Sequence, residues 1–237
     1  PSANGPARSP GVEVRSATLP SGRPNVIWIV VDDLNTAFSV YGDPRVQAPA
    51  FERLAARGTV FERAYAQYPL CNPSRASFLT GRRPAELGVL DNRTPPGDAA
   101  PDAAFVPNLF HAAGYWTYRA GKVVPRNEWD DIMRWDYYAR LNYPVPKPGQ
   151  RIQAEPDVPP SPASGSDGEE GLDLLTDLRR VSGDAVKVLR DRRIVEHTAR
   201  ELKKARNRKR TFFFLLGFNR PHLPFEAPAE YFDRFPP

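Results

Sequence analysis

The chain contains very little cysteine, methionine and histidine: one, one and three residues respectively among 237. A single cysteine excludes a framework of disulfide bonds within the chain. Long hydrophobic runs are also absent, because the longest purely apolar run covers residues 26–31, far below the roughly 20 residues of a membrane-spanning helix. The sequence therefore predicts a protein with no membrane span, in which the neighbours of the one cysteine decide its role.

The composition is that of a globular protein, with 41% apolar and 26% charged residues and 27 prolines. The net charge is +5, and the densest basic run covers residues 203–210. Such a run at the end of a helix is typically a solvated terminus favoured by the helix dipole. No nucleic-acid-binding motif accompanies it, so we predict no nucleic-acid partner. Attraction of an anionic substrate is compatible with this charge.

Three segments set the expected domain organisation. Residues 1–23 are rich in Pro, Ser, Gly and Arg and are predicted to be a flexible leader. Residues 24–237 are expected to form one incomplete catalytic domain. Within it, residues 144–171 have the Pro, Ser and Gly content of an insertion or long loop. The chain starts without methionine, so we expect a processed piece of an exported protein, of periplasmic, extracellular or lysosomal type.

Strand and helix patterns alternate along the chain, which indicates an α/β fold with a largely parallel central sheet flanked by helices. Residues 26–31 are β-branched and apolar, as in a strand buried on both faces. The other expected strands are 59–65, 115–120 and 211–216, and the expected helices follow Pro49 and cover 73–80, 107–113 and 189–206. In the last helix, the predicted inner side chains are Ile194, Val195, Thr198 and Leu202.

The predicted active site lies at the carboxyl ends of the strands, where ligands gather in such sheets. Cys71 precedes a helix that has Pro73 in its first turn, and Arg75 is near enough in sequence to point at the same place. Free backbone N–H groups at a helix start favour an anion. This setting is suited to a thiolate or to an oxyanion derived from one.

The sequence Cys-Asn-Pro-Ser-Arg at residues 71–75, followed by Leu-Thr-Gly-Arg at 79–82, resembles the signature of the type I sulfatases, in the alkaline phosphatase superfamily. The resemblance implies an alkaline-phosphatase-like fold and hydrolysis of a sulfate ester. It also implies that Cys71 is oxidised to Cα-formylglycine by a formylglycine-generating enzyme. The hydrated aldehyde of that residue would then be the nucleophile.

Further segments match the same family. Asp32 and Asp33, at the end of the first strand, resemble two of its calcium ligands, and adjacent carboxylates suit a hard cation. Together with an oxygen derived from Cys71 they would hold one calcium ion. Lys122 resembles the lysine that contacts the sulfate. His222, in the Pro-His-x-Pro segment, resembles the histidine that assists at the leaving group, and Arg75 would bind oxygens of the diol and of the sulfate.

The whole pattern is most similar to the iduronate-2-sulfatase-like branch, which acts on sulfated sugars, but two features depart from it. Pro125 stands where that branch has a histidine. Sulfatases are also about twice as long as this chain, and their later half supplies further metal ligands and a second lysine. Two other interpretations therefore stay open: a phosphonate or phosphate monoester hydrolase of the same superfamily, and an inactive truncated remnant that binds sulfated glycans.

Overall fold

A four-stranded parallel sheet forms the centre of the computed structural model, which describes residues 22–124, 132–139, 178–181, 190–223 and 225–235. The strand order is β1-β5-β2-β3. The bounds are Val26–Val31 for β1, Phe212–Phe218 for β5, Trp116–Gly121 for β2 and Tyr137–Ala139 for β3. All neighbouring pairs run parallel, so the carboxyl ends of the strands meet at one edge. The predicted α/β class with a parallel sheet is confirmed.

The remaining elements are short helices, one long helix and a second small sheet. The short helices are η1 (Ser39–Tyr41), α1 (Pro49–Ala55), α2 (Cys71–Thr80), α3 (Pro84–Leu87), α4 (Pro96–Ala99), α5 (Val106–Ala112) and α7 (Ala229–Phe232), and the long helix is α6 (Arg190–Asn207). Strands β4 (Leu178–Val181) and β6 (Phe225–Pro228) pair in parallel. Proline in the first turn of α1, α3, α4 and α5 fits their beginnings, because the first N–H groups of a helix have no partner within it.

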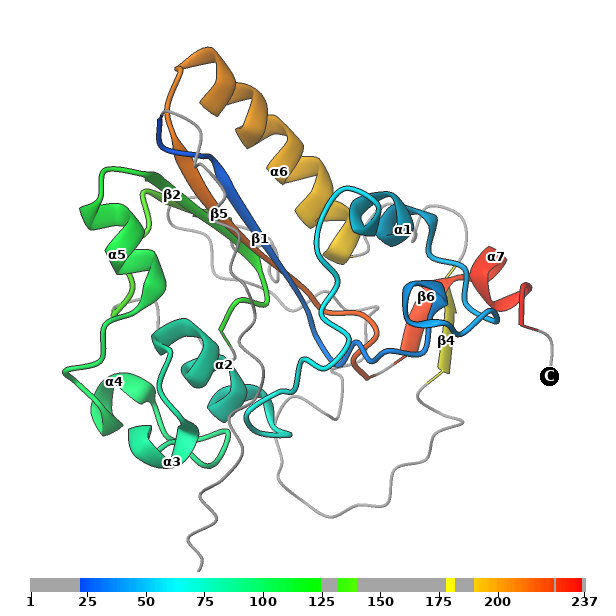
Figure 1. Ribbon diagram of the computed structural model, residues 1–237, viewed down its shortest axis with the longest axis horizontal. Coiled ribbons are helices and arrows are strands. Elements are labelled where there is room, and N and C mark those ends of the chain that lie inside the picture. Colours follow the sequence, from blue (N-terminus) through cyan, green and yellow to red (C-terminus); the bar gives the residue numbers. More distant parts are fainter. Residues whose placement is uncertain (1–21, 125–131, 140–177, 182–189, 224, 236–237) are drawn as a thin grey trace, which may run out of the picture.

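Helices cover both faces of the sheet (Figure 1). On one face, α2 and α5 pack against a core that includes Leu79, Phe213 and Leu215. On the other face, α6 packs against Tyr118 and Phe214. Successive residues of β5 point to opposite faces and are buried on both, as expected of a central strand in a parallel sheet.

Strand β1 departs from the prediction that it is buried on both faces. Ile27 is 47% exposed and Ile29 is 52% exposed, whereas Val26, Trp28 and Val30 pack against the core on the α2 and α5 side. The reason is its place in the sheet. Among the described strands β1 lies at an edge, and the core beneath α6 is built from β2 and β5 without it.

One further prediction is wrong, and another is wrong at a single residue. Residues 59–65 form no strand, and all of them are exposed. In the described part of the chain β1 pairs only with β5, so these residues gain no sheet partner. In α6 the predicted inner residues Ile194 and Thr198 are buried and Leu202 packs against the same core, whereas Val195 is 54% exposed. Glu201 and Ala205 are buried as well. The inner stripe follows the helical spacing i, i+4, i+7 and i+11, which turns Val195 towards solvent.

The other predicted elements are confirmed with small shifts at their ends, as α1, α2, α5, β2, α6 and β5 show. Pro125, the expected insertion at 144–171 and most of the expected leader lie outside the described residues. None of the helices in the described ranges combines the length and the apolar character needed to cross a bilayer.

Candidate active site

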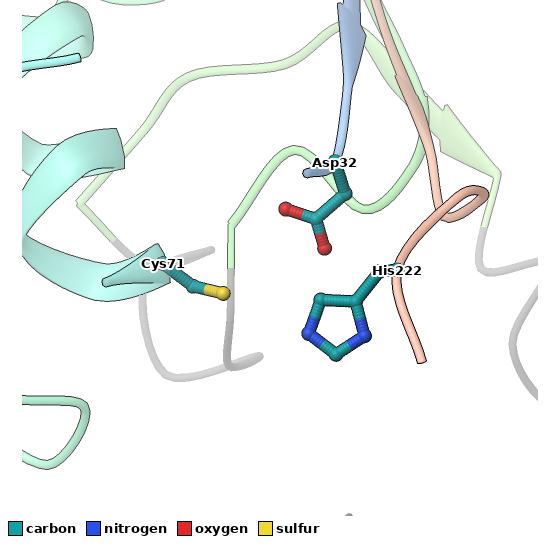
Figure 2. A group of neighbouring side chains, drawn as sticks. All are labelled: Asp32, Cys71 and His222. Atoms are coloured by element: carbon teal, nitrogen blue, oxygen red, sulfur yellow. The ribbon is translucent and has the colours of Figure 1, made fainter. Parts of the chain in front are cut away.

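Three side chains from distant parts of the sequence meet at the carboxyl edge of the sheet. Asp32 follows β1, Cys71 begins α2 and His222 lies in the loop after β5, and Figure 2 shows them facing one another. One ligand atom of each lies within 4.8 Å of the others. The structure therefore brings together three of the residues singled out in the sequence.

Cys71 is the first residue of α2 and not, as expected, the residue before it. The backbone N–H of Asn72 donates to Oδ1 of Asn92 at 3.1 Å, and the N–H of Ser74 donates to the carbonyl of Leu70. The Ser74 bond is the first bond within the helix itself, so the expectation of a free N–H group is wrong only for Asn72. A side chain from the neighbouring loop thus takes one N–H group at the start of α2.

Asp32 is buried between two cations. Its Oδ1 accepts a hydrogen bond from Nη2 of Arg75 at 2.7 Å, and the ammonium of Lys122 forms an ion pair with its Oδ2. Burial alone would raise the pKa of Asp32, but the charge of Arg75 and the hydrogen bonds from Lys122 and Arg75 outweigh it and lower the pKa. Asp32 is thus held as a carboxylate in an interior position.

Arg75 links three elements. Its Nη1 donates to the carbonyls of Lys122 at 2.6 Å and Val123 at 3.1 Å, while Nη2 holds Asp32. The side chain is only 3% exposed, and its Nε is buried without a hydrogen-bond partner. Both terminal nitrogens are taken by protein oxygens, so Arg75 fixes the geometry of α2, the end of β1 and the exit of β2.

Lys122 reaches the sulfur of Cys71, with 3.7 Å between Nζ and Sγ. A close approach of two backbones places it there: its N–H donates to the carbonyl of Gly217 at 2.8 Å. A Cβ on Gly217 would overlap the Lys122 carbonyl, and a Cβ on Gly121 would overlap the Gly217 carbonyl. Glycine at both positions is therefore required for Lys122 to point at Cys71.

His222 is oriented by its own loop. Its Nδ1 donates to the carbonyl of Leu223 at 2.7 Å, and the hydrogen bond with Cys71 raises the pKa of the imidazole above its ordinary value. The same hydrogen bond lowers the pKa of the Cys71 thiol against the opposing effect of burial. Asp191 of α6 secures the loop, because its carboxylate accepts from the N–H groups of Asn219 and Arg220, both at 2.9 Å.

Asp33 is placed differently from its neighbour. Its side chain is 60% exposed, its backbone is left-handed with φ of 58°, and its Oδ2 lies 3.8 Å from Nε2 of His222. The structure thus leaves Asp33 at the rim of the site, beside His222 and not in the buried cluster with Asp32.

Similarity to known proteins assigns the chain to a family. The family model described as "Sulfatase" matches residues 24–237. The chain belongs to the sulfatase family. It is 31% identical over 216 residues to iduronate 2-sulfatase of Mus musculus, covering 90% of this chain and 37% of that protein. It is 32% identical over 221 residues to a sulfatase of Formosa agariphila, covering 90% of this chain and 42% of that protein.

The fold is shared with solved structures. The chain superposes on the phosphonate monoester hydrolase of Agrobacterium radiobacter with a TM-score of 0.62 at 19% identity, covering 90% of this chain and 44% of that one. The alkaline-phosphatase-like fold and the resemblance to the iduronate-2-sulfatase-like branch are therefore confirmed. The chain spans about two fifths of the length of the curated relatives it matches.

The site contains a group of side chains able to hold a metal ion, and its donor atoms are mixed. Asp32 offers a carboxylate oxygen, Cys71 a sulfur and His222 a nitrogen. As a thiol, Cys71 makes this set better suited to a softer ion than calcium. An oxygen in place of that sulfur, beside a buried carboxylate and with Asp33 at the rim, fits a hard cation instead.

Sequence reasoning missed the residues that hold the site together. Asn72 is buried, and its Nδ2 donates to the carbonyls of Asp91 and Thr94 at 2.7 and 2.8 Å, which fixes the loop that carries Asn92. In the sequence, Asn92 stands out only as part of a glycosylation pattern. Asp191 gives a weaker signal, an acidic residue in the first turn of a long helix.

Proposed function

We propose that this sulfatase-family protein hydrolyses a sulfate ester, using a formylglycine made from Cys71. The observation that carries the proposal is the cluster in which Cys71, Asp32 and His222 meet within 4.8 Å, with Lys122 3.7 Å from the sulfur. The Cys71 thiol occupies the place of the aldehyde-derived diol. The ammonium of Lys122, the imidazole of His222 and the carboxylate of Asp32 lie around that place.

The chain's own side chains have separable roles in the proposal. Lys122 stabilises negative charge on the sulfate, since its ammonium lies beside the nucleophile position. Arg75 fixes Asp32 and the backbone of Lys122 and adds positive charge to the site. His222 is the general acid, because its imidazole lies against Cys71 and its pKa is raised.

The bond changes follow from the diol. One hydroxyl loses its proton to solvent and its oxygen attacks sulfur, the bond between sulfur and the ester oxygen breaks, and the proton from His222 goes to the departing alcohol. The second hydroxyl then gives its proton back to His222 and becomes the carbonyl of the aldehyde, while the bond from carbon to the sulfated oxygen breaks and sulfate leaves. Water adds to the aldehyde and restores the diol.

We further propose that Asp32, Asp33 and the oxygen on residue 71 would hold one calcium ion. When bound, the ion would supply charge neutralisation and lower the pKa of the diol hydroxyl. Calcium takes about six to eight oxygen ligands, so the ligands beyond these three would have to come from elsewhere in the protein. Metal analysis of the purified protein, before and after a calcium chelator, tests this part.

The substrate class is proposed as a sulfated sugar, because relatives of this chain carry the names iduronate 2-sulfatase and N-acetylgalactosamine-6-sulfatase. We also propose a formylglycine-generating enzyme as the maturation partner and an exported location. A phosphonate or phosphate monoester hydrolase is the second candidate, supported by the fold shared with the phosphonate monoester hydrolase. Turnover of matched aryl sulfate, aryl phosphate and aryl phosphonate esters separates the two activities.

Replacement of His222 tests the proposed mechanism. His222→Ala is expected to lower kcat for a poor leaving group about 100-fold or more, and much less for a nitrophenol that needs no protonation. His111→Ala is the matched control, since His111 lies beside Asp136 at 3.5 Å, in α5, and takes no part in the cluster. Equal losses for both leaving groups would remove His222 as the general acid.

A further inference from the structure

A basic groove lies at the opposite end of the sheet from Cys71. Its volume is about 520 Å³, and its cationic lining residues are Arg23, Arg206, Lys209 and Arg210. They come from the segment before β1, the end of α6 and the loop that leads into β5. Figure 1 shows these segments together at the amino ends of β1 and β5. We call this surface the amino-end groove.

The cations of this groove are not neutralised within the described part of the chain. None of the four forms an ion pair with a described carboxylate, and no acidic residue lines the groove. Lys204, on the same helix, pairs with Glu201 and does not line it. A concave surface with several positive charges and no internal counter-ion attracts an anionic ligand.

Protein contacts hold two of the cations in place. Nη1 of Arg23 donates to the carbonyl of Ala113, and the guanidinium of Arg210 lies 5.7 Å from the ring centre of Trp116. Arg206 and Lys209 have no such contact within the described residues and are exposed. The groove thus combines two fixed guanidinium groups with two side chains free to close on a ligand.

The apolar residues that line the groove are Leu202, Ala205 and Phe212. Ala205 and Phe212 are buried, so Leu202, which is half-buried, is the apolar side chain open to a ligand. Several cations beside one accessible apolar side chain match a sugar, which presents C–H groups on its ring and charge on its sulfate or carboxylate. Single-stranded nucleic acid fits less well, because it stacks bases on exposed aromatic rings. Here Phe212 is 9% exposed and Trp116 is 5% exposed.

We propose that the amino-end groove binds a sulfated saccharide at a second site, remote from the catalytic cluster. The strands between the two ends cover six or seven residues, which separates the sites by roughly 20 Å. The choice of a sulfated saccharide rests on the proposed function, whereas the existence of an anion site rests on the charges alone. Such a site would raise the affinity for a long acidic substrate without touching the bond that is cleaved.

The test compares two variants that each remove two positive charges from α6 or the residues just beyond it. Arg206→Gln/Lys209→Asn removes the free cations of the groove, and asparagine suits the left-handed backbone at Lys209, where φ is 51°. Arg200→Gln/Lys203→Gln removes two exposed cations of α6 that do not line the groove. The probe is a fluorescent heparin hexasaccharide bound to the complete protein, and turnover of a small aryl sulfate is measured in parallel.

We expect the groove variant to bind the hexasaccharide at least tenfold more weakly and the control variant less than twofold more weakly, with the turnover of each unchanged. Equal losses in both variants, or no loss in either, would overturn the proposal. If inorganic sulfate displaces the hexasaccharide at the same total concentration of sulfate groups, the groove binds free anions. If an oligothymidylate binds as tightly as the hexasaccharide, the groove binds polyanions in general. Each result contradicts a saccharide site. If the proposed catalysis is wrong, the wild-type protein will not turn over the aryl sulfate, but the difference in hexasaccharide binding between the two variants will still be measurable.

Discussion

The two ends of the parallel sheet use positive charge in opposite ways. At the carboxyl end, Arg75 and Lys122 are bound to the buried carboxylate of Asp32. At the amino end, Arg206 and Lys209 have no carboxylate partner among the described residues. The buried carboxylate fixes Arg75 in place and holds Lys122 beside Cys71, whereas cations without a counter-ion remain free to adjust to a ligand. The comparison therefore separates a rigid chemical site from a surface for electrostatic binding.

Removal of the buried carboxylate should have the largest effect. Asp32→Asn leaves the buried Arg75 and the half-buried Lys122 without their counter-charge, so we expect unfolding to become easier by about 4 kcal/mol, together with a large loss of turnover. Asp33→Asn is the matched control for stability, since Asp33 is exposed and asparagine accepts its left-handed backbone. Urea denaturation of both variants checks the contrast, and similar stability losses would refute it.

The close approach of two backbones at the carboxyl end should be the next most sensitive feature. A Cβ at Gly217 overlaps the backbone of Lys122, so Gly217→Ala should destabilise the fold by about 3 kcal/mol and displace Lys122 from Cys71. Gly58→Ala is the control, because a Cβ there meets only the Leu54 carbonyl at 3.4 Å. A Gly217→Ala protein with the melting temperature of the wild type would contradict the argument.

The polar contacts around Cys71 should give a smaller effect. Asn92→Ala removes the acceptor of the Asn72 N–H at the start of α2, with an expected loss of about 1 kcal/mol and a severalfold lower kcat. Asn207→Ala, at the exposed end of α6, should change neither quantity. Thermal melts and aryl sulfate turnover provide the measurement. A glycan found on Asn92 would show that its side chain is not held as described.

The amino end should be the least sensitive to loss of a single charge. Arg210→Ala removes a cation that lies over Trp116, so stability should fall by only about 0.5 kcal/mol while turnover of a small aryl sulfate stays unchanged. Arg208→Ala, also exposed, is the control for loss of charge. A drop in turnover for Arg210→Ala alone would show that the two ends of the sheet are coupled.

Much of the fold followed from local patterns. The apolar runs of β1 and β5 and the prolines in the first turns of α1 and α5 are local features, and these elements were predicted. The errors concern what packs where. Exposure of Ile27 depends on the edge position of β1, and the phase of α6 depends on which face meets the sheet.

In the candidate site, too, the features marked by local sequence were predicted and the contacts between distant residues were not. Cys71, Lys122 and His222 were predicted because short motifs of the resembled family marked them. Lys122 and His222 also follow strands, which implied a common edge. The side chains that hold them were not predicted, since the bond from Asn72 to Asn92 and those from the Asn219 loop to Asp191 join residues far apart in sequence. Local patterns carry no signal for such contacts.

The most direct test of the account is the mass of the peptide that contains Cys71, taken from protein made together with a formylglycine-generating enzyme. The account predicts an aldehyde at residue 71, trapped by a hydrazide probe, in the same preparation that hydrolyses an aryl sulfate. An active preparation in which residue 71 is an unmodified thiol would contradict the claim that the nucleophile is made from Cys71.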